Sequence, residues 1–444
     1  MNQWLAVLLL AVALLGVLGA LYVVGKRHSM PAEVSRKITH IALGFVTLSF
    51  PWLFRDPWPP AVLAGAAIAV MVGMRRVAWL HDRFGSLVNG VGRESLGDLY
   101  FPVAAVSLFL LSRGSAVLFA IPILTLTLAD AVAATIGLRY GRLRFATADG
   151  TKSMEGSIAF FMVAFLATHI PLLLFTRTPR IDSLLIGATF GVLVMLLEAV
   201  AWRGLDNLFI PIGGYLVLSS SLGLDTASLA ENLVVAVVLL AVVLGARRSH
   251  TLNDSALLAG VLIGYVSWSV GGWRWLVPPL VVFLSYAVFF PRPEQIAARP
   301  HDLVAIFAVT SAGLLWLALR FILPDNIAYY AYTLSFAANL CFIGVTWFAV
   351  ARPGVNRGVA IIAAGLIAWG ALFVPFLFIR GSAVSSVVDA ITALFIVMFS
   401  GAAYTAIVRP GTRLEYRYVW EQQAMVALAA SIMAALVAKP LALQ

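Results

Sequence analysis

The residues best placed to do chemistry in this chain are charged side chains inside or at the ends of long apolar segments. Charge is costly to place in hydrocarbon, so each of these residues is a functional candidate. In the first half of the chain they are Arg36, Lys37 and His40; Glu94 and Asp98; Asp130; Arg139, Arg142, Arg144, Lys152 and Glu155; Glu198; Asp206 and Asn207. Carboxylates and cations that converge from several helices are what a site for a nucleotide and a divalent metal ion requires.

The stretch from Asp130 to Ser157 contains the largest group of these residues. Asp130 lies near the end of an apolar segment, where its carboxylate could bind a metal ion. The predicted nucleotide- and phosphate-binding residues are Gly137, Arg139, Gly141, Arg142, Arg144, Lys152 and Ser157. The glycines allow close approach, and the cations suit phosphate oxygens. Two plainer interpretations stay open: the basic residues could only anchor the chain at the membrane surface, and Asp130 could hydrogen-bond a neighbouring helix.

A second acidic stretch begins at Glu198, about a turn from the end of its apolar segment. Asp206 and Asn207 occupy the short turn that follows. Together with Asp130 and Glu155, these side chains form the predicted ligand set for Mg²⁺ or Mn²⁺. Asp206 and Asn207 would serve equally well as a helix N-cap.

Two residues are candidate proton acceptors for a substrate hydroxyl. His40 enters one apolar segment from its polar end, and Asp98, with Glu94 as its neighbour, enters another. A general base in phosphoryl transfer orients or deprotonates the attacking hydroxyl. The alternative is that these side chains only lie at the level of the lipid headgroups or cap their helices.

The composition indicates that membrane-spanning helices position these residues. Of the 444 residues, 62% are hydrophobic and 11% are charged, whereas about a quarter are charged in a soluble domain. Apolar runs long enough to cross a bilayer recur along almost the whole chain, and they lack the alternation of a transmembrane barrel. We therefore expect an all-α, polytopic transmembrane helical bundle of about sixteen spans, with the first run retained as a helix. The single cysteine excludes an internal disulfide.

The distribution of positive charge predicts the orientation in the membrane. When the Lys and Arg residues are sorted by alternating loops, 22 of the 30 fall on the side that carries the candidate site and 8 fall on the other. The more basic side is expected to be cytoplasmic, which puts the N-terminus outside. The net charge of +10 is thus mainly a topology signal, and no nucleic-acid partner is expected.

Five motifs resemble those of a known family, the membrane polyprenol kinases, which comprise dolichol kinases, phytol kinases and CTP-dependent diacylglycerol kinases. The resemblance covers roughly residues 30–220. It rests on Arg36-Lys37-x-x-His40, Ser95-Leu-Gly-x-x-Tyr-Phe-Pro102, Asp130 with Gly137 and Gly141, Lys152-Ser-Met-Glu155-Gly-Ser157, and Glu198 with Asp206, Asn207 and Pro211. It implies transfer of a γ-phosphoryl group, often from CTP, to an isoprenoid or lipid hydroxyl with a divalent cation. Thr151 stands where family members often carry a second basic residue.

The chain is expected to form two domains, residues 1–225 and residues 226–444. The second half more weakly resembles a membrane family that includes phytyl-phosphate kinases, through Ser255-Ala-Leu-Leu-Ala-Gly260 and Gly271-Gly-Trp-Arg-Trp275. That family has an acidic segment, but the matching stretch here, Ser335 to Phe342, contains no acid. We therefore expect the second half to be non-catalytic, with a fused second kinase as the alternative.

The sequence thus predicts an integral kinase of a prokaryotic cytoplasmic membrane, with its active site facing the cytoplasm. Its predicted catalytic residues are Asp130, Lys152, Glu155, His40 and Asp98. The expected partners are the bilayer, a nucleotide (CTP or another NTP) and an alcohol such as phytol, geranylgeraniol or a polyprenol. Two alternatives stay open: a transporter or lipid flippase, and a CTP-dependent cytidylyltransferase of a lipid phosphate. The sequence leaves the oligomeric state open.

Overall fold

The structure is a computed structural model of the chain. It describes residues 2–28, 32–77, 96–148, 150–249, 251–290, 301–381, 383–408 and 416–438. The candidate Glu94 and the side chain of Arg36 lie outside what it describes. The chain divides into two compact units, Met1–Val237 and Val238–Gln444. We refer to them as unit 1 and unit 2.

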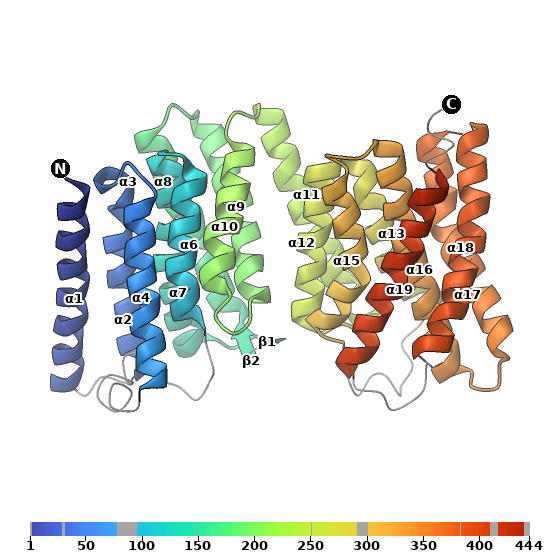
Figure 1. Cartoon of the computed structure of the whole chain (residues 1–444), viewed down its shortest axis with the longest axis horizontal. Coiled ribbons are helices and arrows are strands. Elements are labelled where there is room, and N and C mark those ends of the chain that lie inside the picture. The colour runs from blue at the N-terminus through green and yellow to red at the C-terminus, as the bar shows by residue number, and fades with distance from the viewer. Residues whose placement is uncertain are drawn as a thin grey trace. The chain divides into compact units, whose positions relative to one another are not determined.

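Unit 1 is a bundle of helices that stand side by side (Figure 1). Its described helices are α1 (Gln3–Arg27), α2 (Ala32–Leu48), α3 (Phe50–Leu53), α4 (Trp58–Arg76), α6 (Gly97–Ser112), α7 (Ala116–Tyr140), α8 (Met154–Phe175), α9 (Arg180–Val200), α10 (Asp206–Ser221) and α11 (Thr226–Gly245), which continues into unit 2. Helices α8 and α9, α9 and α10, and α10 and α11 are joined by short turns. The buried core is apolar and includes Phe160, Phe190 and Ile210.

A short β-hairpin joins α7 to α8 at the end of unit 1 where α7 ends (Figure 1). Strands β1 (Arg144–Thr147) and β2 (Gly150–Ser153) pair antiparallel, with Phe145 opposite Lys152. Ser153 ends β2 and is also the N-cap of α8, where its hydroxyl accepts a hydrogen bond from the backbone N–H of Gly156. Because a capping serine fixes the start of a helix, the hairpin is held directly against the first turn of α8.

Helices α7 and α8 approach closely where glycines face this cap. A Cβ on Gly137 would lie 3.0 Å from Ser153 Oγ, and one on Gly156 would lie 3.0 Å from the carbonyl oxygen of Ala133. A Cβ on Gly141 would lie 2.8 Å from Ser153. In a bilayer the hydrophobic effect does not drive helices together. Membrane helices therefore associate through close packing, which small residues permit. The glycines therefore bring the polar end of α7 against the start of α8.

Unit 2 is a second bundle of helices. After the 3₁₀ turn η1 (Arg247–Ser249), its described helices are α12 (Asp254–Gly271), α13 (Trp273–Phe289), α15 (Leu303–Leu319), α16 (Asp325–Ala351), α17 (Arg357–Arg380), α18 (Val384–Val408) and α19 (Tyr416–Ala438). Helix α16 is its centre: most residues from Ile327 to Val345 are buried. Inside this core, Asn339 donates to the carbonyl oxygens of Val309 and Ser335 and accepts from Gln423.

The predicted fold class is confirmed. Among the described residues, eleven helices are long and apolar enough to cross a membrane, and the shorter apolar helices include α6, α13 and α15. The only strands in the described part of the chain are those of the hairpin. Many large apolar side chains on the helices are exposed, as expected for surfaces that face lipid. The chain is an all-α, polytopic membrane protein.

Candidate active site

Five charged residues of unit 1 form a cluster at the end of the bundle that carries the hairpin: Lys37, Asp130, Lys152, Glu198 and Asp206. We call it the carboxylate–lysine cluster. Lys37, in the first half of α2, lies with its Nζ 2.5 Å from Asp130 Oδ2 on α7. Each side chain is only 17% exposed. Such a pair ties α2 to α7 and satisfies charges that are costly to bury.

The second pair of the cluster joins the hairpin to α9. Lys152 Nζ lies 2.7 Å from Glu198 Oε1, and it also donates a hydrogen bond to the backbone carbonyl oxygen of Glu198. Burial alone lowers the pKa of the Lys152 ammonium, but the negative charges of Glu198, Asp206 and Asp130 raise the pKa by more than burial lowers it. The pKa of Lys152 is therefore raised above its ordinary value of 10.5, and the side chain is a permanent cation at neutral pH.

Asp206, the first residue of α10, is the third carboxylate of the cluster. It lies within electrostatic range of Asp130, Lys152, Lys37 and His40. The loop that leads to it makes a left-handed turn at Arg203 (φ 51°) and Gly204 (φ 83°), and the Arg203 carbonyl oxygen accepts the N–H of Leu96 ahead of α6. The cluster therefore combines three carboxylates with two lysines, from four helices and the hairpin.

Glu155 lies in the first turn of α8, as the sequence predicts. Its carboxylate accepts hydrogen bonds from the backbone N–H groups of Arg142 (3.0 Å) and Leu143 (3.2 Å). These contacts hold the segment between α7 and β1 against the first turn of α8. Glu155 therefore stabilises the hairpin in this arrangement, and its oxygens are directed to backbone amides.

The predicted phosphate-binding residues fall into two groups. The side chains of Arg139, Arg142 and Arg144 are exposed on the end of α7 and on the hairpin, where a solvent-borne anion could reach them. Gly137 and Gly141 instead contact Ser153 in the α7–α8 packing. Ser157 and Asn207 lie in the first turns of α8 and α10 and are partly buried.

The two candidate proton acceptors lie on neighbouring helices. His40 packs edge-on against Phe101 of α6, with ring centroids 5.4 Å apart. Asp98 accepts from Arg75 of α4 at 2.5 Å through Oδ1, while its buried Oδ2 has no hydrogen-bond partner among the described residues. The Asp98–Arg75 pair joins α4 to α6.

Lys37 and Arg75 are the residues that the prediction of site roles omitted. Lys37 is among the candidates and in the Arg36-Lys37-x-x-His40 motif but receives no role from the sequence, and Arg75 enters only the count of basic residues on one side of the membrane. The signal for Lys37 was its spacing: it precedes His40 by three residues on α2, so both side chains share one face of the helix. Arg75 carried no such signal, because its partner Asp98 lies 23 residues away in the sequence.

The cluster contains carboxylate oxygens, which are the type of donor that suits a hard divalent cation. Carboxylate oxygens are the protein ligands that Mg²⁺ prefers, together with phosphate oxygens and water. Within the described part of the chain, no three acidic, histidine or cysteine side chains are grouped as ligands of one metal ion. Asp130 and Glu198 each bond to a lysine instead.

Unit 1 is therefore a helical membrane domain with a carboxylate–lysine cluster at one end. A phytol kinase of the cyanobacterium Synechocystis sp. is 32% identical to this chain over 219 residues, which cover 48% of this chain and 90% of that protein. No family model matches the chain, and no solved structure is detectably similar to it. The chain belongs to the polyprenol and phytol kinase family.

Proposed function

We propose that unit 1 is a lipid-alcohol kinase that transfers the γ-phosphoryl group of CTP, or of another nucleoside triphosphate, to an isoprenoid alcohol such as phytol. The observation that carries the proposal is the carboxylate–lysine cluster, in which Lys37 and Lys152 lie beside Asp130, Asp206 and Glu198. Phosphoryl transfer needs little covalent chemistry from the protein. It needs positioning and charge stabilisation, and this residue set supplies both signs of charge. The relative's activity supports the same reaction.

Each residue of the cluster has a proposed role. Lys152 and Lys37 exchange their carboxylate partners for phosphate oxygens when the nucleotide binds. Asp130, thereby released from Lys37, and the neighbouring Asp206 would hold Mg²⁺ or Mn²⁺, which would neutralise charge on the phosphates. Arg139, Arg142 and Arg144 on the exposed side of the hairpin guide the nucleotide to the site.

We propose His40 as the acceptor of the hydroxyl proton. It lies within electrostatic range of Asp206, whereas Asp98 is held by Arg75. The reaction is balanced: the alcohol oxygen forms a bond to the γ-phosphorus, the bond from the γ-phosphorus to the bridging oxygen breaks, and a nucleoside diphosphate leaves. The hydroxyl proton passes to His40. We further propose that this end of unit 1 faces the cytoplasm of a prokaryotic cell, where nucleotides are present.

The products decide between this reaction and its closest rival. A kinase converts γ-labelled CTP or ATP into a labelled, organic-soluble lipid phosphate and releases an unlabelled diphosphate. A cytidylyltransferase would instead release labelled pyrophosphate. The test uses full-length protein in detergent with Mg²⁺ and, separately, phytol, geranylgeraniol, a polyprenol, diacylglycerol and phosphatidic acid, the last being the lipid phosphate that a cytidylyltransferase would require. Labelled pyrophosphate without labelled lipid would overturn the proposal.

A further inference from the structure

Unit 2 contains a second group of charged side chains that the kinase proposal does not use. Arg274, Arg320, Arg380, Asp325 and Asp389 lie at the ends of its helices, at the end where α13 and α16 begin. We call this group the arginine cluster. It has three positive and two negative charges, which leaves one positive charge without a carboxylate from the cluster. Charge sorting assigns all three arginines to the less basic side of the membrane, so topology does not explain them.

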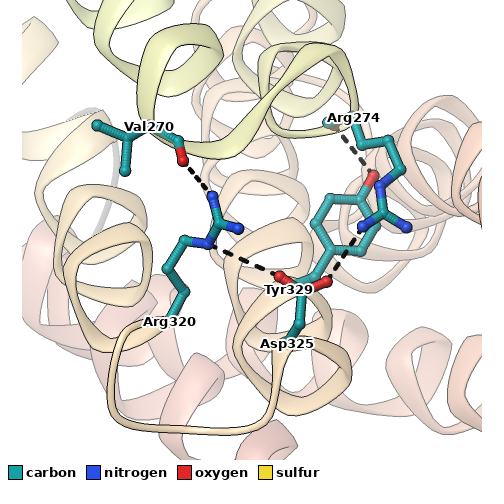
Figure 2. Close-up of polar contacts among 5 residues, drawn as sticks. All are labelled: Val270, Arg274, Arg320, Asp325 and Tyr329. Atoms are coloured by element: carbon teal, nitrogen blue, oxygen red, sulfur yellow. Dashed lines mark hydrogen bonds and ion pairs between the residues drawn. The ribbon is translucent and has the colours of Figure 1, made fainter. Parts of the chain in front are cut away.

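Asp325 lies between two guanidinium groups (Figure 2). One of its oxygens lies 3.2 Å from Arg274 Nη2, and the other lies 3.7 Å from Arg320 Nε. Arg320 also donates to the carbonyl oxygen of Val270 at the end of α12. The Asp325 and Arg274 side chains are 44% and 43% exposed, so an external anion can reach Arg274, while Arg320 beside it is 25% exposed.

Aromatic rings form the base of the arginine cluster. The Arg320 guanidinium carbon lies 5.3 Å from the ring centroid of Trp275. Tyr329 donates to the Arg274 carbonyl oxygen and stacks on Phe376 (Figure 2 shows the Tyr329 contact). Stacked and hydrogen-bonded guanidiniums keep their fork geometry, so the donors are held in place before a ligand arrives.

One buried donor and two helix N-termini in this region lack side-chain acceptors. Trp275 is fully buried, and its indole N–H has no hydrogen-bond partner among the described residues. A buried donor without an acceptor is destabilising, so it indicates a missing partner. The helices α13 and α16 also begin here without side-chain caps, at Gly272 and Pro324, and the first N–H groups of a helix favour anions.

We propose that the arginine cluster binds the phosphate headgroup of an anionic lipid. Guanidiniums bind phosphate through two parallel hydrogen bonds. Exposed apolar side chains adjoin the arginines along the chain: Trp273 is 61% exposed, Phe321 76% and Phe378 85%. A ligand that satisfies both surfaces carries a phosphate and a hydrocarbon tail. The proposal does not depend on the kinase reaction of unit 1.

The test measures binding of dioleoyl phosphatidic acid to the full-length protein in detergent by native mass spectrometry. Arg274→Gln is expected to weaken binding about tenfold, because it removes a charge-assisted donor pair. Asp325→Asn is expected to tighten binding by about fivefold, because it releases both guanidiniums from their present partner. Arg248→Gln, which removes an exposed charge elsewhere in unit 2, should leave binding unchanged.

Asp325→Asn makes the test decisive. If the ion pairs only join helix ends, this variant will lose stability and bind no more lipid than the wild type, and the proposal fails. Equal binding by wild type and Arg274→Gln would overturn it as well. Diacylglycerol and inorganic phosphate are the companion probes. Binding of diacylglycerol as tight as that of phosphatidic acid, or complete displacement of the lipid by inorganic phosphate at equal concentration, would contradict recognition of a lipid phosphate.

Discussion

Replacing Lys152 with methionine tests the energetic role of the Lys152–Glu198 pair. The ammonium lies 2.7 Å from Glu198 Oε1, and the two side chains are 27% and 12% exposed. Breaking a fully buried ion pair by removing one partner costs about 3–5 kcal/mol. Because Lys152 keeps contact with solvent, we expect Lys152→Met to lower the free energy of unfolding by about 2–3 kcal/mol.

The double variant Lys152→Met with Glu198→Gln separates stability from activity. It removes the uncompensated carboxylate, so it should recover at least about 1 kcal/mol of what the single variant lost. It should not recover phosphoryl transfer, because the proposed phosphate-binding ammonium is still missing. Stability would be followed by circular dichroism during denaturation of the detergent-solubilised protein with SDS, and activity by the labelled-nucleotide assay.

Arg55→Met is the matched control, since Arg55 is exposed in the turn between α3 and α4. It should change the free energy of unfolding by less than about 0.5 kcal/mol. A double variant no more stable than Lys152→Met would refute the coupling between the two charges. Wild-type turnover by Lys152→Met would remove this lysine from the proposed mechanism.

Three further predictions test the positioning of the cluster. A Cβ on Gly44 of α2 would lie 2.1 Å from Thr127 Oγ1 on α7, so Gly44→Ala should lower the free energy of unfolding by about 1–3 kcal/mol and reduce turnover by separating Lys37 from Asp130. Because the folded-state pKa of Lys152 is raised, its stabilisation is present below about pH 10.5 and disappears as the pH rises through the raised value; thermal denaturation between pH 9 and 12 would measure this. Glu155→Gln keeps an acceptor for the hairpin amides and should preserve turnover, whereas Glu155→Ala should raise the KM for nucleotide more than it lowers kcat.

Each of these predictions has a control or an outcome that would contradict it. Gly16→Ala meets open space and serves as the control for Gly44→Ala; equal stability losses would show that the Thr127 contact is unimportant. The alkaline loss of stability should be smaller in the Lys152→Met, Glu198→Gln double variant, and an identical pH profile would exclude this pair as its source. Loss of all turnover in Glu155→Gln would restore Glu155 as a candidate metal ligand.

The class of fold could be predicted because the signal for a membrane-spanning helix lies within one continuous stretch of sequence. Runs of about twenty apolar residues must form helices in lipid, and the excess of hydrophobic side chains left little alternative. The position of the polar end of unit 1 was also readable, since Asp130 lies in the second half of α7, Glu198 lies near the end of α9 and Asp206 begins α10.

The pairings inside the site could not be read from the sequence. Lys37 meets Asp130 across 93 residues, and this contact depends on how α2 packs on α7, not on any local motif. The contacts of Glu155 were unreadable for a similar reason, because the segment before the hairpin folds back and presents two backbone amides to its carboxylate. Its role as a metal ligand stays a prediction.

The arginine cluster was invisible for the same physical reason. Asp325 and Asp389 are 64 residues apart, and no motif in the sequence indicates that they share one end of unit 2. Helix packing brings Arg274 and Arg320 to Asp325, while Arg380 meets Asp389 from the neighbouring helix. Charge counting along the chain assigned the arginines to one side of the membrane but could not assign their partners.

The most direct test of the central claim compares wild type and Asp130→Asn in the transfer of γ-label to phytol. The variant keeps the size of the side chain and a hydrogen-bond acceptor for Lys37 but removes its negative charge. We expect labelled phytyl phosphate from the wild type, and at least about a hundredfold less from the variant, measured under conditions in which circular dichroism shows that both proteins are folded, because Asp130→Asn also leaves Lys37 without its anion. Wild-type rates from Asp130→Asn, or no lipid phosphate from the wild type with any of the alcohols, would contradict the assignment of the carboxylate–lysine cluster as a kinase active site.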